Sequence, residues 1–166
     1  MKKTIIILGL LFLYEINVFS QEKEVSMQLL CIANTKDEIK IKFQFTNSSE
    51  KDVAIYTLTP TDICRNFFEI NFISIKDSTI HTYKPCDWIA DAELIKLDCK
   101  NSIILAPKEA KILNMNLHKK RIFPFLKKNI SYNVFLKLYL KDNIGKSVFT
   151  NYFAEDILSN YLIYNN

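Results

Sequence analysis

The residues best suited to chemistry lie between Cys86 and Cys99. This segment contains four carboxylates and the single tryptophan of the chain: Asp87, Trp88, Asp91, Glu93 and Asp98. A pair of carboxylates could act as general acid and base on a glycan, and carboxylate oxygens could bind calcium. However, the spacing matches no EF-hand loop, and no glycine provides the sharp turn that such a loop needs. The sequence therefore favours a solvated loop that Trp88 anchors in the core, or a loop that binds a partner, over an enzyme that uses the acidic 87–98 loop.

The redox state of the cysteines depends on the compartment, and the N-terminal residues predict export. Lys2 and Lys3 precede an apolar run at residues 5–13, and the small residue Ser20 offers a cleavage position. This is the pattern of a secretory signal peptide over residues 1–20. A membrane-spanning helix would need about 20 apolar residues, and polar side chains interrupt this run too early. We therefore expect a mature chain of residues 21–166 in the periplasm or outside the cell.

The chain has four cysteines, Cys31, Cys64, Cys86 and Cys99. An even number of cysteines in an oxidising compartment predicts two disulfide bonds. A bond between Cys86 and Cys99 would close a loop of about 14 residues, which stabilises by about 3 kcal/mol in the chain-entropy model. Cys31 would then pair with Cys64, although the other two pairings stay open. The wide spacing does not favour zinc, whose sites use cysteines about two to four residues apart, so we expect neither a metal nor a cofactor.

Several segments alternate between apolar and polar residues, which is typical of half-buried strands. In residues 39–46 the side chains of Ile39, Ile41, Phe43 and Phe45 share one face, and lysine, glutamine and threonine occupy the other. Residues 131–141 alternate in the same way. Further strands are expected at 25–33, 53–58, 67–75, 80–84, 102–106, 110–117 and 147–154. Turns are expected at 47–52 and around Gly145 in a hairpin at 142–146, because asparagine, serine and aspartate bond to their own backbone there.

Short strands at regular spacing predict an all-β fold, an immunoglobulin-like antiparallel β-sandwich of about 7–9 strands. A short helical turn could form in the 86–99 loop, and the tail at 155–166 could be a final helix or an added strand. The chain of 166 residues, with a net charge of +4, is long enough for one domain with its own core, expected over 21–166. The charge is too mild to indicate nucleic acid binding.

The order of these features resembles that of bacterial exported immunoglobulin-like domains. Residues 41–62 look like the second strand, polar turn and third strand of such a domain, and 67–85 resemble its central hairpin. Residues 103–117 resemble the Leu-x-Pro-x-Glu turn before an outer strand, and 130–140 resemble the closing tyrosine-led strand. The arrangement, over about 24–154, is similar to proteinase-inhibitor-type domains related to BsuPI and to domains appended to some secreted metalloproteases. The resemblance implies the sandwich fold and an exported, non-catalytic role, and it carries over no functional residue.

Residues 118–128 combine cations with apolar side chains. Lys119, Lys120 and Arg121 precede Phe123 and Phe125. A loop of this kind could bind an acidic protein face or anionic lipid head groups. Alternatively, the apolar residues plug one end of the sandwich while the lysines stay in water.

These observations lead to the hypothesis of an exported, non-catalytic module that binds another macromolecule, in an inhibitor-like or immunity-type role. We expect a protein partner, and a membrane surface could be contacted through 118–128. The expected partner-binding residues are Lys119, Lys120, Arg121, Phe123, Phe125 and Trp88. The two histidines, at 81 and 118, accompany no G-x-S-x-G motif, so no catalytic residue is expected. An envelope accessory protein without a discrete ligand is the alternative.

Overall fold

The structure, a computed structural model, describes residues 24–57, 63, 67–83, 94–119 and 125–166. The predicted signal peptide lies outside these ranges, so its cleavage stays a prediction. The described residues form twelve strands: β1 (Val25–Asn34), β2 (Glu38–Asn47), β3 (Val53–Tyr56), β4 (Phe68–Ser74), β5 (Ile80–Thr82), β6 (Ile95–Leu97), β7 (Ser102–Leu105), β8 (Ala110–His118), β9 (Ser131–Leu138), β10 (Ile144–Ser147), β11 (Ile157–Leu158) and β12 (Leu162–Asn165). The prediction of an all-β fold is confirmed.

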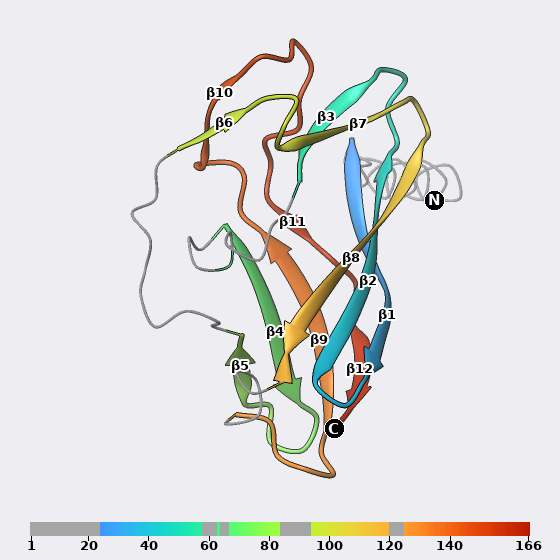
Figure 1. Cartoon of the computed structure of the whole chain (residues 1–166), viewed down its shortest axis with the longest axis vertical. Coiled ribbons are helices and arrows are strands. Elements are labelled where there is room, and N and C mark those ends of the chain that lie inside the picture. The colour runs from blue at the N-terminus through green and yellow to red at the C-terminus, as the bar shows by residue number, and fades with distance from the viewer. Residues whose placement is uncertain (1–23, 58–62, 64–66, 84–93, 120–124) are drawn as a thin grey trace, which may run out of the picture.

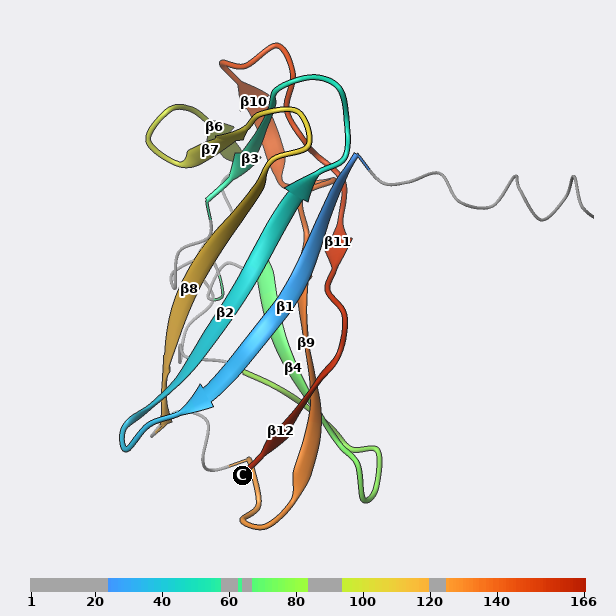
Figure 2. The ribbon, with the colours of Figure 1, turned by 90° about the vertical axis from the view of Figure 1, so that its right-hand side faces the viewer.

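Two antiparallel sheets form the sandwich (Figures 1 and 2). The first sheet has the order β1-β2-β8. The second has the order β5-β4-β9, and both β11 and β12 pair with the far side of β9. With β1, β2 and β8 as strands A, B and E, and β4, β9 and β12 as C, F and G, this is the order of an immunoglobulin-like sandwich. The extra strand β5 pairs with β4.

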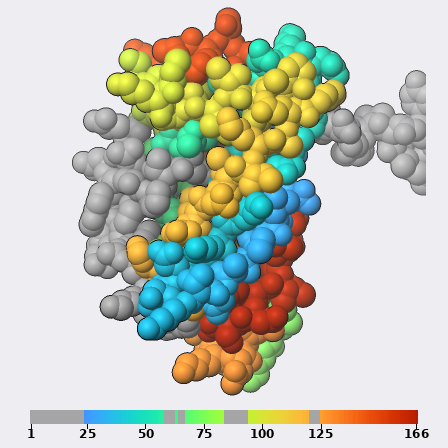
Figure 3. Space-filling model, turned by 45° about the vertical axis from the view of Figure 1, so that its right-hand side comes forward, coloured from blue at the N-terminus to red at the C-terminus, as the bar shows by residue number. Residues whose placement is uncertain are grey.

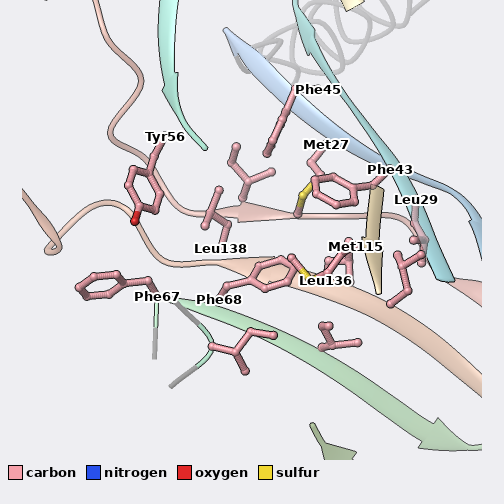
Figure 4. Close-up of a cluster of buried hydrophobic side chains, with 14 of the residues drawn as sticks. Met27, Leu29, Phe43, Phe45, Tyr56, Phe67, Phe68, Met115, Leu136 and Leu138 are labelled. Atoms are coloured by element: carbon pink, nitrogen blue, oxygen red, sulfur yellow. The ribbon is translucent and has the colours of Figure 1, made fainter. Parts of the chain in front are cut away.

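The core lies between the two sheets, as the alternation predicts. Side chains from both sheets point toward one another in Figure 4, among them Phe43 on β2, Phe68 on β4 and Leu136 on β9. All the predicted inward residues of β2 and β9 are buried: Ile39, Ile41, Phe43, Phe45, Tyr132, Val134, Leu136 and Leu138. The rings of Phe43 and Phe68, from opposite sheets, lie 6.5 Å apart. Apolar burial of this kind is the main stabilising term of the fold.

Tyr132 fixes the start of β9 as a tyrosine corner. Its hydroxyl accepts a hydrogen bond from the backbone N–H of Lys127 at 2.8 Å, five residues upstream. Its ring packs edge-on against Phe72 at a centroid distance of 6.4 Å. This hydroxyl-to-backbone bond is a recurrent feature of immunoglobulin-type sandwiches. It explains locally why a tyrosine begins the closing long strand.

The predicted turn after β2 is organised by Asn47, whose side chain is fully buried. Its Nδ2 donates to the backbone carbonyls of Lys51, Leu105 and Ala106 at 2.7, 3.1 and 3.0 Å. Its Oδ1 accepts a hydrogen bond from the N–H of Ser49 at 2.9 Å. One amide side chain therefore joins the turn between β2 and β3 to the turn between β7 and β8.

The C-terminal tail at 155–166 forms the added strands β11 and β12 and not a final helix. It closes one side of the sandwich. Asn160, between β11 and β12, accepts a hydrogen bond from Leu29 N–H at 2.6 Å and donates to Leu29 C=O at 3.2 Å. A side-chain amide thus takes the place of a neighbouring strand beside β1. The β1–β2 register also shifts between Leu29 and Cys31, so β1 carries a bulge at the same point.

Two local expectations are wrong. Gly145 lies inside β10, which pairs in parallel with β6, and the turn occupies residues 141–143. A Cβ at Gly145 would lie 2.7 Å from the Cβ of Leu94, so glycine permits the close approach of two segments of the chain here rather than a turn. Residues 147–154 do not form a strand of their own: Ser147 ends β10, and of 148–154 only Tyr152 forms a bridge, with Ala54. The short helical turn considered for the 86–99 loop stays a prediction, because 84–93 lie outside the described residues and only 95–97, the strand β6, are described as a regular element there.

Candidate functional site

The cationic-aromatic segment 118–128 divides into a surface part and a buried part. Phe125 is half exposed, but Leu126 is buried in the core. The carbonyls of Leu126 and Lys127 accept hydrogen bonds from the Asn166 side chain at 3.3 and 3.1 Å. The two apolar residues of the described part therefore do not form one surface. Leu126 fills the end of the sandwich, and Phe125 faces water. Lys120, Arg121 and Phe123 lie outside the described residues.

The acidic 87–98 loop is described only at its end. Asp98 accepts a hydrogen bond from Lys100 N–H at 2.8 Å, and the Asn101 side chain accepts one from Asp98 N–H at 2.8 Å. These contacts shape the turn between β6 and β7, which is a structural role for this carboxylate. Asp87, Trp88, Asp91 and Glu93 lie outside the described residues, so the joint role expected for the loop stays a prediction.

The four cysteines are described in part. Cys31 and Cys99 are exposed and carry free thiols in the structure. Cys64 and Cys86 lie outside the described residues. The pairings Cys31–Cys64 and Cys86–Cys99 therefore stay predictions.

Neither histidine has the surroundings of a catalytic base. The imidazole of His81 packs against Tyr132 with ring centroids 6.3 Å apart. His118 is largely exposed and lies 4.0 Å from Glu38. Within the described ranges, no group of three or more histidine, cysteine, aspartate or glutamate side chains is placed to hold a metal ion. Among the same residues, no helix is long and apolar enough to cross a membrane.

The outer face of the five-stranded sheet carries a group of apolar side chains among polar ones such as Asn71 and Asn133, and the sequence pattern did not predict this group. The surface, here called the apolar face, consists of Ile73, Ile75, Ile80, Phe135, Leu158, Tyr161 and Ile163. These residues come from β4, β5, β9, β11 and β12 and from the segments that adjoin them. Five of them are among the exposed large hydrophobic residues of the chain: Ile75, Ile80, Leu158, Tyr161 and Ile163.

The strand register brings these residues together. Ile80 pairs with Ile73, Ile73 pairs with Asn133, and Asn133 pairs with Ile163, so one row crosses four strands. Side chains that pair across neighbouring antiparallel strands lie on the same side of the sheet. The inward neighbours of these residues in the chain are core residues, so the whole row faces away from the core.

The next row carries the aromatic part of the apolar face. The rings of Phe135 and Tyr161 lie 5.1 Å apart, within the range of favourable ring contacts. Tyr161 is 53 % exposed and Ile163 is 65 % exposed, so water contacts most of both side chains. Phe135 is only half buried. A half-buried phenylalanine, an exposed tyrosine and an exposed isoleucine on one face form the kind of apolar patch that marks an interaction site.

Polar side chains border the apolar face. The Tyr139 hydroxyl donates to Oε2 of Glu69 at 2.9 Å, and the Lys137 ammonium lies 4.2 Å from the centre of the Tyr139 ring. Interaction with the Tyr139 side chain raises the pKa of Lys137, so this lysine stays charged at neutral pH. At the opposite border the Ser131 hydroxyl donates to Oδ1 of Asn165 at 2.6 Å. An apolar centre with a hydrogen-bonded polar border is the usual anatomy of a protein-binding surface.

Two shallow hollows at the end of the molecule near β3, β6, β7 and β10 have volumes of about 220 and 270 Å³. The lining of the larger hollow includes Ala54. Ala54 pairs with Ile104 on one side and forms a bridge with Tyr152 on the other. Asp52 is the only titratable residue among its described lining. Neither hollow brings together the acid, base or nucleophile that a catalytic site requires.

Comparison of the chain with protein-family models, with curated proteins and with solved structures gave no match.

The apolar face left a weak signal in the sequence. The outward positions of 67–75 and 131–141 include Ile73 and Phe135, which an ordinary solvated face would replace with polar residues. Ile75 ends the predicted strand 67–75 and Ile80 begins the predicted strand 80–84. The other members, Leu158, Tyr161 and Ile163, come from 155–166, whose pairing with β9 could not be assigned from its own pattern. The pairing of β11 and β12 with β9 unites the two sets.

Proposed function

We propose that this protein is an exported, non-catalytic module that binds another protein through the apolar face. The observation that carries the proposal is the exposed set of Ile163, Tyr161 and Ile80 on one regular sheet. Each square ångström of apolar surface kept in water costs about 25 cal/mol relative to burial. A partner that covers these side chains would recover that free energy.

The build of the apolar face also supports binding of a folded or extended protein. The side chains stand on paired strands, so the surface is largely formed before a partner arrives, and little conformational entropy is lost on binding. Tyrosine and phenylalanine are frequent anchors at the centre of protein interfaces, where truncation of one anchor costs about 2 kcal/mol or more. Export rests on the charged and apolar residues at 1–20 and not on the apolar face.

The proposal can be tested by affinity capture from an extract of the cells that produce the protein. Three baits are compared: the wild-type protein, the Ile163→Lys variant and the Gln28→Lys variant. Gln28→Lys is the matched control, because it makes the same charge change on the exposed polar outer face of β1. We expect the wild-type and Gln28→Lys baits to retain the same protein, and the Ile163→Lys bait to retain at least tenfold less of it. Equal thermal unfolding of the three baits would show that the loss is not a folding defect. Equal capture by all three baits, or capture no greater than that of blank resin, would overturn the proposal.

A further inference from the structure

Strand β8 is an outer strand of the three-stranded sheet. It pairs with β2 along nine residue pairs without a register shift, from Thr46 with Ala110 to Glu38 with His118. Its other side pairs with no strand in the part of the chain that the structure describes. The space-filling view shows β8 and β2 side by side at the surface (Figure 3).

The backbone groups that point away from β2 can be assigned. In an antiparallel pair, every second residue exchanges hydrogen bonds with the partner strand. At one end Asn47 N–H donates to Glu109 C=O at 2.9 Å, and at the other Lys119 N–H donates to Asp37 C=O at 3.0 Å. The odd-numbered residues of β8 therefore bond to β2. The even-numbered residues direct their N–H and C=O groups outward: Ala110, Ile112, Asn114, Asn116 and His118.

The outer edges of β1, β5 and β12 carry protective features that β8 lacks within the part of the chain that the structure describes. On β1, the outward N–H and C=O of Leu29 bond to Asn160, and a bulge follows. Strand β5 has only three residues, and β12 has four. Short strands, bulges and side-chain cover are the usual means of preventing unwanted strand pairing. Strand β8 has nine residues, contains no proline and shows no bulge against β2.

The charges beside this edge favour an acidic occupant. Lys40 and Lys42 are exposed on the outer face of β2, directly beside Asn116 and Asn114 of β8. Lys111 is exposed near the start of β8, but it belongs to the row of Leu113, Met115 and Leu117 on the other side of the sheet. Glu38, beside His118 at one end, is the one carboxylate among the outward side chains of β2. Lysines therefore outnumber carboxylates along the outward side of β2. An added strand would lie about 10 Å from β2, within reach of long lysine side chains.

We propose that the outer edge of β8 takes up an extended acidic segment of a partner protein as an added strand. Main-chain hydrogen bonds to the even-numbered residues would give affinity, and the lysines would select carboxylates. This site lies on the other sheet from the apolar face, so it goes beyond binding at that face and does not depend on it.

The test uses a fluorescein-labelled octapeptide of alternating valine and glutamate, with fluorescence anisotropy as the readout. The matched peptide alternates valine and lysine. We expect the glutamate peptide to bind at least tenfold more tightly than the lysine peptide, and its affinity to fall as salt is added. No binding of the glutamate peptide, or equal binding of both peptides, would overturn the proposal.

Two variants locate the peptide on β8. Asn114→Pro removes an N–H that points outward, so no bond to β2 is lost, and Asn114→Ala is its control. We expect at least tenfold weaker binding for the proline variant and unchanged binding for the alanine variant. If the proline variant does not fold, Lys40→Glu with Lys42→Glu serves instead, and it should reverse the preference between the peptides. Unchanged peptide binding in these variants would overturn the acidic segment as occupant. The same holds if sedimentation shows that the wild-type protein is a dimer and that Asn114→Pro dissociates it, because the occupant would then be a second copy of the chain. Ile163→Lys should bind the peptide normally, which separates this test from that of the apolar face.

Discussion

The two outer faces of the sandwich differ in how many large apolar side chains they expose, although both are built from strands with a regular alternation. On β2 the outward side chains are glutamate, lysines, glutamine and threonine, which water solvates well. On the five-stranded sheet the outward set includes Ile73, Phe135 and Ile163. Alternation alone therefore fixes which way a side chain points, and the chemistry of the outward set distinguishes a solvated face from one suited to a partner.

The largest expected effect separates the inner and outer rows of the five-stranded sheet. Phe72 is 1 % exposed and packs against Tyr132 and Tyr164. Phe72→Ala should lower the free energy of unfolding by about 3–5 kcal/mol, because it removes a buried ring and leaves a cavity. Ile163→Ala should change the free energy by no more than about 0.5 kcal/mol, because its side chain is largely in water. Urea denaturation measures both, and equal losses would mean that the outer row belongs to the core.

A smaller loss of stability is expected where a polar side chain is buried and not on a solvated face. Asn47 is a buried exception, and its amide holds two turns together. Asn47→Ala should lower the free energy of unfolding by about 2–3 kcal/mol, because buried backbone groups lose their partners. Asn114→Ala, on the exposed outer face of β8, is the matched control and should stay within about 0.5 kcal/mol. If chemical denaturation gives the two variants the same stability, the turn does not depend on this side chain.

Much of the sandwich could be predicted from the sequence because a strand with one buried face must alternate. The inward residues of β2 and β9 follow directly from the period of two. The turn at Asn47 was also predictable, since asparagine and serine bond to nearby backbone groups. The parallel pair β6–β10 was not, because it joins segments far apart in the chain and each strand is only three or four residues long.

The candidate surfaces were harder to predict than the fold. The cationic-aromatic segment drew attention because its residues are adjacent in sequence, yet Leu126 and Phe125 lie in different environments. The apolar face is assembled from segments that are far apart in the chain, because β4, β5, β11 and β12 all join β9 in one sheet. No local pattern specifies such long-range contacts, so the apolar face emerges only when the register is known.

The most direct measurement of the central claim is photo-crosslinking in intact producing cells. A photoreactive phenylalanine analogue replaces Tyr161 on the apolar face, and in a second strain it replaces Gln28 on the polar face. Both positions are exposed, so neither replacement should disturb the core. The account predicts a discrete cross-linked protein from position 161 and none from position 28. A cross-link from position 28 alone, or from neither position, would contradict the assignment of the apolar face as the binding surface.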